Sequence, residues 1–243
     1  MTDEQIEVAQ KYVEYHREAF GFSKANTQFR KGVIEDLKQA GIEDNSIDCV
    51  ISNCVVNLSG DKERVFCEVW RVLKPGGELY FSDVFSDRRI PEALQKDKVL
   101  WGECLSGALY IEDFRRMMQR VGFNYYYTAK QSAITVENPA LEALCGDIKF
   151  YSITIRAYKI PELEDRCEDY GETAVYLGTM GPGYEREFKF DRSHTFKTGE
   201  PLRVCRNFSL VLTKCSLFKK HFEVSGGGAH LGLFETAPGV CGC

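Results

Sequence analysis

The sequence predicts an α/β fold centred on two parallel strands joined by a helix, and three neighbouring segments carry this prediction. A short β-branched apolar run at 47–51 is typical of a buried strand. Residues 62–73 place apolar side chains at helical spacing, and the KPGG stretch at 74–77 follows as a turn that ends the helix. A second apolar strand is expected at 78–84. This order makes one βαβ unit, which nearly always forms a right-handed crossover in a parallel sheet.

Two elements are expected before this unit. Thr2 precedes two acidic residues and suits the N-cap of an amphipathic helix that continues to Gly21. A short strand is expected at 28–32, and residues 33–37 then begin the connection to the central unit.

The elements expected after the unit complete the sheet and add a second module. A helix with one apolar face is predicted at 111–121, ending at Gly122. Alternating side chains predict three further strands that give the sheet an antiparallel edge: 125–128, 132–136 and 149–157. An acidic stretch at 161–169 marks the expected domain boundary. Beyond it, short strands between glycine and proline turns predict a small α+β module: 173–177, 187–190, 202–205 and 222–224.

Length and composition exclude several classes of protein. The 243 residues allow one ordinary domain and a smaller one, and 44% of them are hydrophobic. A formal charge of -5 without a basic stripe argues against a nucleic-acid partner. No apolar run is long enough to span a bilayer, and the first residues lack a signal pattern. We therefore predict a soluble, cytoplasmic protein that does not bind membranes.

Ten cysteines are a high number for a cytosolic chain of this length. They are scattered, apart from Cys241 and Cys243, and no CxxC pair predicts a zinc site. Without a secretion signal a disulfide framework is not expected, so several thiols are available for soft-ion or redox chemistry. Two sit inside predicted elements and are expected to pack there: Cys49 and Cys67. Four more are expected to be structural or incidental: Cys145, Cys167, Cys205 and Cys215.

One cysteine occupies a position where ligands usually bind. In an open parallel sheet the ligand crevice lies beyond the carboxyl ends of the strands, so residues 52–54 and 82–83 should face it. Cys54 is then either a functional thiol or a small buried hydrophobe, because unpaired cysteine is among the most buried residue types. Position alone leaves both interpretations open.

Three stretches together resemble one family. They are SNCVVNL at 52–58, LKPGGELYFSD at 73–83 and KVLWGECLSGALY at 98–110. The sequence resembles the arsenite methyltransferases, which use S-adenosylmethionine to methylate trivalent arsenic, and the resemblance covers nearly the whole chain. The LKPGG turn is common to many methyltransferases, whereas SNC followed by WGEC is specific to this family.

The resemblance implies the architecture of the chain. Residues 1–160 should form a partial class I methyltransferase (Rossmann-like) sheet that lacks its first strands. Residues 161–243 should form the α+β C-terminal module of arsenite methyltransferases. The family's first strand, glycine-rich cofactor loop and second strand should precede Met1, so we expect an amino-terminally truncated member that binds S-adenosylmethionine weakly or not at all.

The resemblance also implies roles for individual residues. Cys54 and Cys104 match the thiols that bind arsenic and carry catalysis, and Glu103 is the adjacent acid at the substrate. The other matched positions belong to the cofactor site: Ile34 and Glu35 beside the adenine, Asn53 and Val55 along the pocket, and Met1 and Thr2 just after the acid that holds the ribose. No metal cofactor is implied, because arsenic is the substrate.

The implied partners follow from this chemistry. S-adenosylmethionine is the cofactor, trivalent arsenic or its thiol conjugates are the substrate, and a thiol reductant (glutathione or thioredoxin) is the co-substrate of a protein that is monomeric in the intact family. Two other functions stay open: methylation of a different small molecule, and a non-catalytic fragment that binds arsenicals.

Soft trivalent arsenic prefers thiolate ligands, as soft metal ions do. Two or three sulfur ligands leave its lone pair free to attack a methyl carbon, so no general base is needed at arsenic. Positioning of donor and acceptor could then supply about 7–11 kcal/mol of the acceleration. A thiol in this role is expected to have a depressed pKa or to hold a soft ion already.

Overall fold

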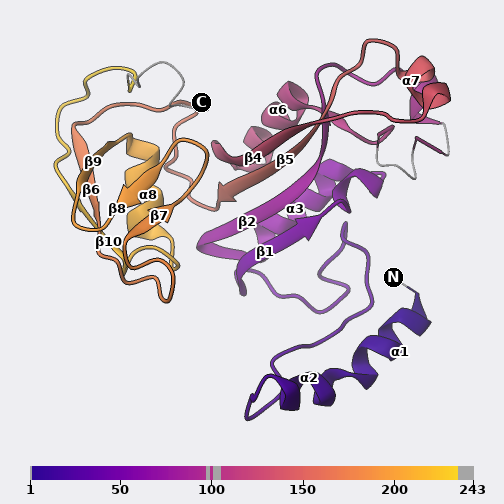
Figure 1. Ribbon diagram of the computed structural model, residues 1–243, viewed down its shortest axis with the longest axis horizontal. Coiled ribbons are helices and arrows are strands. Elements are labelled where there is room, and N and C mark those ends of the chain that lie inside the picture. Colours follow the sequence, from indigo (N-terminus) through magenta and orange to yellow (C-terminus); the bar gives the residue numbers. More distant parts are fainter. Residues whose placement is uncertain (1, 97–98, 101–104, 235–243) are drawn as a thin grey trace.

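The structure is a computed structural model that describes residues 2–96, 99–100 and 105–234. Figure 1 shows a helical N-terminal arm, a central sheet and a separate C-terminal module. The sheet has the order β1-β2-β5-β4, with β3 beside β2. Within the described residues, no helix is both long enough and apolar enough to cross a bilayer.

The predicted βαβ unit and antiparallel edge are confirmed. β1 (Ile47–Asn53) runs parallel to β2 (Leu73–Ser86), and α3 (Lys62–Val72) connects them after the 3-10 turn η1 (Val56–Leu58). The edge strands pair antiparallel, β2 with β5 and β5 with β4. The other elements of this part are listed by their bounds: β3 (Leu109–Tyr110), α4 (Glu92–Gln95), α6 (Ile111–Val121), β4 (Tyr126–Ile134), α7 (Pro139–Cys145) and β5 (Phe150–Tyr158).

Helices α3 and α6 cover one face of the sheet. Phe66 of α3 and Phe114 of α6 are buried against Phe81 and Phe85 of β2, with ring centroids 5.2 to 5.7 Å from Phe114. The bounds of α6 match the prediction, since its apolar side chains recur at helical spacing. Gly122 ends α6 with a φ of 121°, in backbone that favours glycine.

The predicted KPGG turn is wrong, because these residues belong to β2 itself. The register between β1 and β2 shifts between Ile47 and Cys49, so residues 74–77 form a bulge in the strand. Gly76 has a φ of 77°, and its N–H donates to Lys159 O at 2.8 Å. A glycine bulge therefore replaces the expected turn, and the helix leads directly into the strand.

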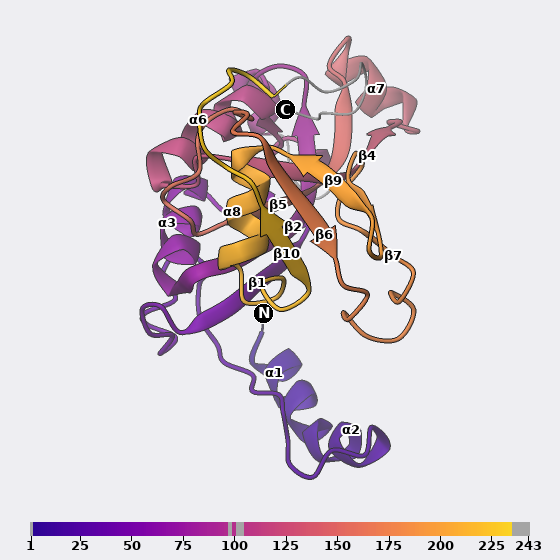
Figure 2. The ribbon, with the colours of Figure 1, turned by 90° about the vertical axis from the view of Figure 1, so that its left-hand side faces the viewer.

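The N-terminal arm also differs from the prediction. Thr2 is the expected N-cap and forms a capping box with Gln5, but the single helix is broken at Tyr12 into α1 (Asp3–Lys11) and α2 (Val13–Ala19). Its aromatic side chains are mostly exposed, and Figures 1 and 2 show the arm extending away from the sheet. The strand expected at 28–32 does not form, since Arg30 instead donates to the carbonyls of the 40–41 turn.

Other expectations along the chain need smaller corrections. The strands expected at 125–128 and 132–136 are one strand, β4, with an irregular register between Thr128 and Lys130. Cys67 was expected to pack in the core but lies exposed on the outer face of α3, whereas Cys49 is half-buried. The outer face of an amphipathic helix carries such residues without structural cost.

The C-terminal module is the predicted α+β unit. Its strands form a three-stranded sheet of order β10-β6-β9 and a β7-β8 hairpin. Strand β8 and helix α8 were not predicted from the sequence, and Figure 2 shows α8 beside β6 and β10. The bounds of these elements are β6 (Glu172–Tyr176), β7 (Glu187–Lys189), β8 (Thr195–Lys197), β9 (Pro201–Val204), α8 (Arg206–Lys214) and β10 (Phe222–Ser225).

A buried ion pair joins the sheet to this module. Arg156 of β5 donates to both carboxylate oxygens of Glu78 on β2, at 2.6 and 3.1 Å, and Tyr158 donates to the same carboxylate. Arg156 also donates to Phe190 O at 3.1 Å and lies 4.2 Å from the Phe190 ring centroid. The Arg156 guanidinium is therefore bound by the Glu78 carboxylate within the sheet and by the Phe190 carbonyl of the C-terminal module.

Replacing Gly76 tests the close approach of the β2 bulge to α8. A Cβ at this position would lie 2.5 Å from Lys214 O, while a Cβ at Gly199 would meet nothing within 4 Å at the same φ of 77°. We expect Gly76→Ala to lower the free energy of unfolding by about 2–4 kcal/mol, and Gly199→Ala by about 1 kcal/mol. Urea unfolding of both variants measures the difference. Equal losses would contradict the packing of the bulge against α8.

Candidate active site

Cys54 lies at the carboxyl end of β1, at the edge of the sheet predicted for it. Its backbone has a φ of 52°, a left-handed conformation that is uncommon for a residue with a side chain. Its N–H donates to Ser82 O at 2.9 Å, and the residue is exposed. Backbone of this kind persists where surrounding contacts impose it, often at functional sites.

The turn that follows Cys54 is held by Asp83 and Asn57. Asp83 was expected to face the crevice, but its side chain is 1% exposed and lies beneath the turn that follows Cys54. Its carboxylate accepts from Asn57 N at 3.1 Å and from Val84 N at 2.9 Å. The Asn57 amide in turn donates to Val84 O at 2.7 Å. The turn is thereby fixed to the end of β2.

The electrostatics of Cys54 contradict one expectation. Burial raises the pKa of the Cys54 thiol, and the Asp83 carboxylate raises it further. Burial also raises the pKa of Asp83, despite the hydrogen bonds from Val84 and Asn57 and the nearby Lys62. The expected depressed pKa is therefore wrong for Cys54, because partial burial and the nearby Asp83 carboxylate both raise it. The alternative expectation, a thiol that already holds a soft ion, stays a prediction.

Glu103, Cys104 and Met1 lie outside the described residues, as do Cys241 and Cys243. The residues directly after Cys104 are described, and they pack on the turn after Cys54. A Cβ at Gly107 would lie 2.3 Å from Asn57 O, closer than any side chain could fit. Glycine is thus required where residues 105–108 meet the turn held by Asp83.

The residues expected to bind the cofactor lie in three different parts of the structure. Asn53 and Val55 are exposed beside Cys54, and the Cys54 thiol donates to Asn53 Oδ1 at 3.7 Å. Ile34 packs against the core and lines a hollow of about 650 Å³ beside β1. Glu35 accepts a hydrogen bond from the Ser59 hydroxyl, at the start of α3. Thr2 caps α1, and Figure 1 shows α1 in the arm that extends away from the sheet.

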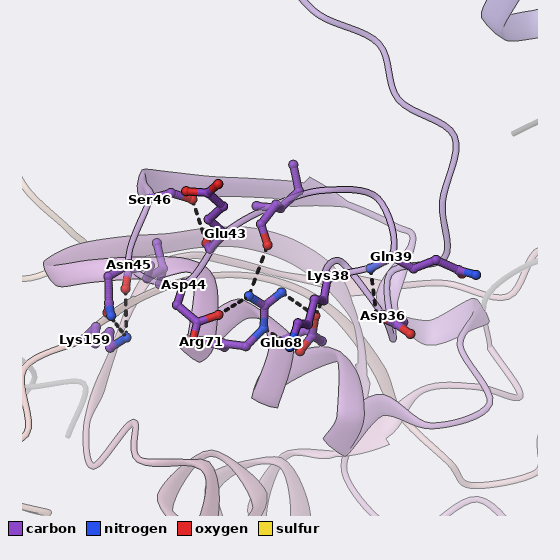
Figure 3. A network of polar contacts seen from close by, with 12 residues as sticks. Asp36, Lys38, Gln39, Glu43, Asp44, Asn45, Ser46, Glu68, Arg71 and Lys159 are labelled. Carbon is purple, nitrogen blue, oxygen red and sulfur yellow. Dashed lines mark hydrogen bonds and ion pairs between the residues drawn. The ribbon is translucent and has the colours of Figure 1, made fainter.

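The connection that carries Ile34 and Glu35 is tied to α3 by the polar network of Figure 3. Arg71 donates to Glu68 at 2.7 and 2.8 Å, to Asp44 at 2.5 Å and to Ile42 O at 3.1 Å. Hydrogen bonding to Glu68 raises the pKa of Arg71. Sequence analysis missed this network and the Asn57 anchor, because neither has a motif and both join residues far apart in the chain.

Comparisons with known proteins agree with this architecture. A family model described as a methyltransferase domain matches residues 1–122, and a model of the arsenite methyltransferase C-terminal domain matches residues 171–236. The crystal structure of an arsenic (III) S-adenosylmethionine methyltransferase from Chlamydomonas reinhardtii superimposes with a TM-score of 0.91 at 44% identity, covering 97% of this chain and 78% of that one. The fold is that of a class I methyltransferase.

Two relatives show which family of methyltransferases the chain belongs to. The chain is 45% identical over 240 residues to the arsenite methyltransferase of Aquipseudomonas alcaligenes, covering 98% of this chain and 68% of the relative. It is 42% identical over 233 residues to the arsenite methyltransferase of Homo sapiens, covering 95% of this chain and 60% of the relative. The chain belongs to the arsenite methyltransferase family and spans between 56% and 68% of the length of the bacterial and mammalian relatives.

Replacing Gly107 tests the contact between the two segments of the site. We expect Gly107→Ala to lower the free energy of unfolding by about 1–3 kcal/mol, because the added carbon overlaps Asn57 O. Gly60→Ala is the matched control, since a Cβ there would meet nothing within 4 Å. That variant should be unchanged or stabilised by about 0.4–1 kcal/mol. Equal unfolding curves for both variants would exclude the close contact.

Asp83→Asn tests the electrostatic effect on Cys54. Loss of the negative charge should move the alkylation of Cys54 by iodoacetamide to lower pH, although the effect of burial, the larger cause of its raised pKa, remains. Mass spectrometry of the alkylated peptides measures the pH profile, with exposed Cys67 as the internal control. A Cys54 profile that does not move relative to Cys67 would show that Asp83 has no influence.

Proposed function

We propose that this chain transfers a methyl group from S-adenosylmethionine to trivalent arsenic bound by Cys54 and Cys104. The expected weak binding of S-adenosylmethionine stays a prediction and would lower the rate of this transfer. The observation that carries this proposal is the packing of Gly107 against Asn57 O, since it joins the segment after Cys104 to the turn after Cys54. The membership of the chain in the arsenite methyltransferase family supports the same assignment. Glu103 is assigned to the substrate site by its place next to Cys104.

The raised pKa of Cys54 is compatible with this role. Arsenous acid carries hydroxyl groups, and each thiol that replaces one passes its proton to the leaving hydroxyl. Two thiols and one arsenous acid therefore give two arsenic–sulfur bonds and two waters, with no free thiolate required. Substitution at arsenic can thus proceed although burial and Asp83 raise the pKa of the Cys54 thiol.

The residues around Cys54 fit a cofactor with an apolar body and polar groups. Val55 and Ile51 are large apolar side chains left exposed beside the Asn53 amide, and Ile51 is 77% exposed. We assign Asn53, Val55 and Ile34 to the cofactor, with Glu35 positioning the 33–37 connection through Ser59. Met1 and Thr2 are assigned from the family resemblance alone. S-adenosylmethionine supplies a methyl group on a positively charged sulfur.

The proposal also covers the domains, the reductant and the oligomeric state of the protein. We assign residues 1–160 to the methyltransferase domain and residues 161–243 to the C-terminal module, whose strands form sheets of their own apart from the central sheet. A thiol reductant such as glutathione or thioredoxin supplies the two electrons that return methylated arsenic to its trivalent state. The proposed protein is a cytoplasmic monomer, in keeping with the family resemblance.

Arsenite retention and methyl transfer test the two cysteines separately. Cys54→Ser and Cys104→Ser should each reduce transfer of radiolabelled methyl from S-adenosylmethionine to arsenite by at least about 100-fold, the effect of losing a positioning ligand. Each should also reduce arsenite retention in gel filtration. Cys67→Ser is the control, because that thiol lies on the exposed face of α3.

The outcomes separate the competing functions. Retention of arsenite without methylated product would favour the non-catalytic binder. Methylation of a carbon or oxygen acceptor that survives both substitutions would favour a methyltransferase for another small molecule. Loss of activity in Cys67→Ser, equal to that of the other two, would contradict the assignment of the site.

A further inference from the structure

Two cysteines of the C-terminal half lie together in the core, away from the candidate active site. Cys167 follows β5 in the connection to the module, and Cys205 is the N-cap of α8. They are 7% and 3% exposed. Each thiol shifts the pKa of the other, so the two side chains lie close together, and the Tyr125 hydroxyl of the sheet side lies 3.2 Å from Cys167 Sγ.

The backbones on either side of the pair are held together. Arg206 N donates to Glu168 O at 2.9 Å, and the Asn207 amide donates to Arg166 O at 3.0 Å. These bonds involve the immediate neighbours of both cysteines. A disulfide needs Cα atoms about 4.4–6.8 Å apart, and the hydrogen bond between the residues that follow the two cysteines keeps their backbones close together.

The surroundings give the two sulfur atoms different roles. Hydrogen bonds from Cys205 and Tyr125 lower the pKa of Cys167, although burial and the charges of Asp191 and Glu168 oppose this. The same bond to Cys167, together with burial, raises the pKa of Cys205. Cys167 is therefore the thiol of the pair that loses its proton more readily, and Cys205 is the one that holds its proton more strongly.

A second aromatic hydroxyl faces this pair. Tyr127 is buried, and burial raises the pKa of its hydroxyl, with further contributions from Cys205 and Cys167. In the described part of the chain its oxygen has no hydrogen-bond partner. A buried hydroxyl left without a partner beside two thiols is available to stabilise charge that forms on sulfur or on an attacking oxidant.

We propose that Cys167 and Cys205 form a reversible disulfide when the protein meets a small peroxide. The Cys167 thiolate attacks one peroxide oxygen, which gives a sulfenic acid and, after protonation, one molecule of water or alcohol. The Cys205 thiol then displaces the sulfenic hydroxyl as water and forms the S–S bond. Two thiols are oxidised by two electrons and one peroxide is reduced, and a dithiol reductant reverses the change.

This disulfide would join the connection after β5 to the start of α8. Tyr125 and Tyr127 of the sheet side pack in the same apolar cluster as Phe208 of α8. Oxidation would therefore cross-link the chain at the place where the two modules meet. It would also close a loop of 38 positions, which stabilises a fold by restricting its unfolded state.

Peptide mapping of the full chain tests the proposal. After treatment with one equivalent of hydrogen peroxide and alkylation of remaining thiols under denaturing conditions, mass spectrometry should detect a Cys167–Cys205 cross-linked peptide, lighter by two hydrogen atoms than its two parts. Dithiothreitol should remove it. The thermal midpoint of the oxidised chain should rise by about 5–15 °C.

Two variants serve as a matched pair, because Cys205 and Cys215 are buried cysteines at opposite ends of α8. Cys205→Ser should lose the cross-link and the shift of the midpoint, and Cys215→Ser should keep both. If Cys205→Ser does not fold, the peptide map of the unmodified chain decides alone. Sulfinic acid, other cross-links or two unchanged thiols in that map would overturn the proposal. Protection of both thiols by phenylarsine oxide without disulfide formation by peroxide would indicate a soft-ion site instead.

Discussion

The hydrogen bonds between the buried Asp83 carboxylate and the turn at Asn57 are the constraint on which the candidate site depends. They fix the turn that directly follows Cys54, whose backbone is left-handed at the end of β1. The carbonyl of the same Asn57 is the surface against which Gly107 packs. One residue pair thus sets the direction of one thiol and the approach of the segment that carries the other. Burial and, to a smaller extent, this Asp83 carboxylate raise the pKa of the Cys54 thiol.

Strand β2 connects this site to the C-terminal module. Asp83 lies near its end and Glu78 near its middle, and Glu78 receives Arg156 and Tyr158 at the junction with the module. A buried ion pair adds little net stability but requires a defined arrangement of its partners. The surrounding rings and the Phe190 carbonyl complete that arrangement. The orientation of the module is therefore specified by the same strand that supports the candidate site.

Local sequence patterns were sufficient to predict the helices and strands whose apolar residues recur at a clear period. The bounds of α6 follow from its apolar spacing and Gly122, and the parallel pairing of β1 and β2 follows from the strand-helix-strand order. Helix α8 was missed because buried polar residues, Asn207 and Ser209, interrupt its apolar pattern.

Other features depend on contacts between distant residues and leave no local signal. The bulge at Gly76 exists because α8 and Lys159 approach it. The raised pKa of Cys54 arises from burial and from Asp83, a residue on another strand. The placement of Cys54 was predicted from strand topology, while its electrostatic environment required the structure.

Arsenic K-edge X-ray absorption of the arsenite-loaded chain tests the central claim most directly. All measurements use the Cys205→Ser variant, which removes the second thiol pair. We predict at least two sulfur neighbours per arsenic and the loss of one on replacing either Cys54 or Cys104 by serine. An unchanged sulfur count in both variants would contradict a shared arsenic site.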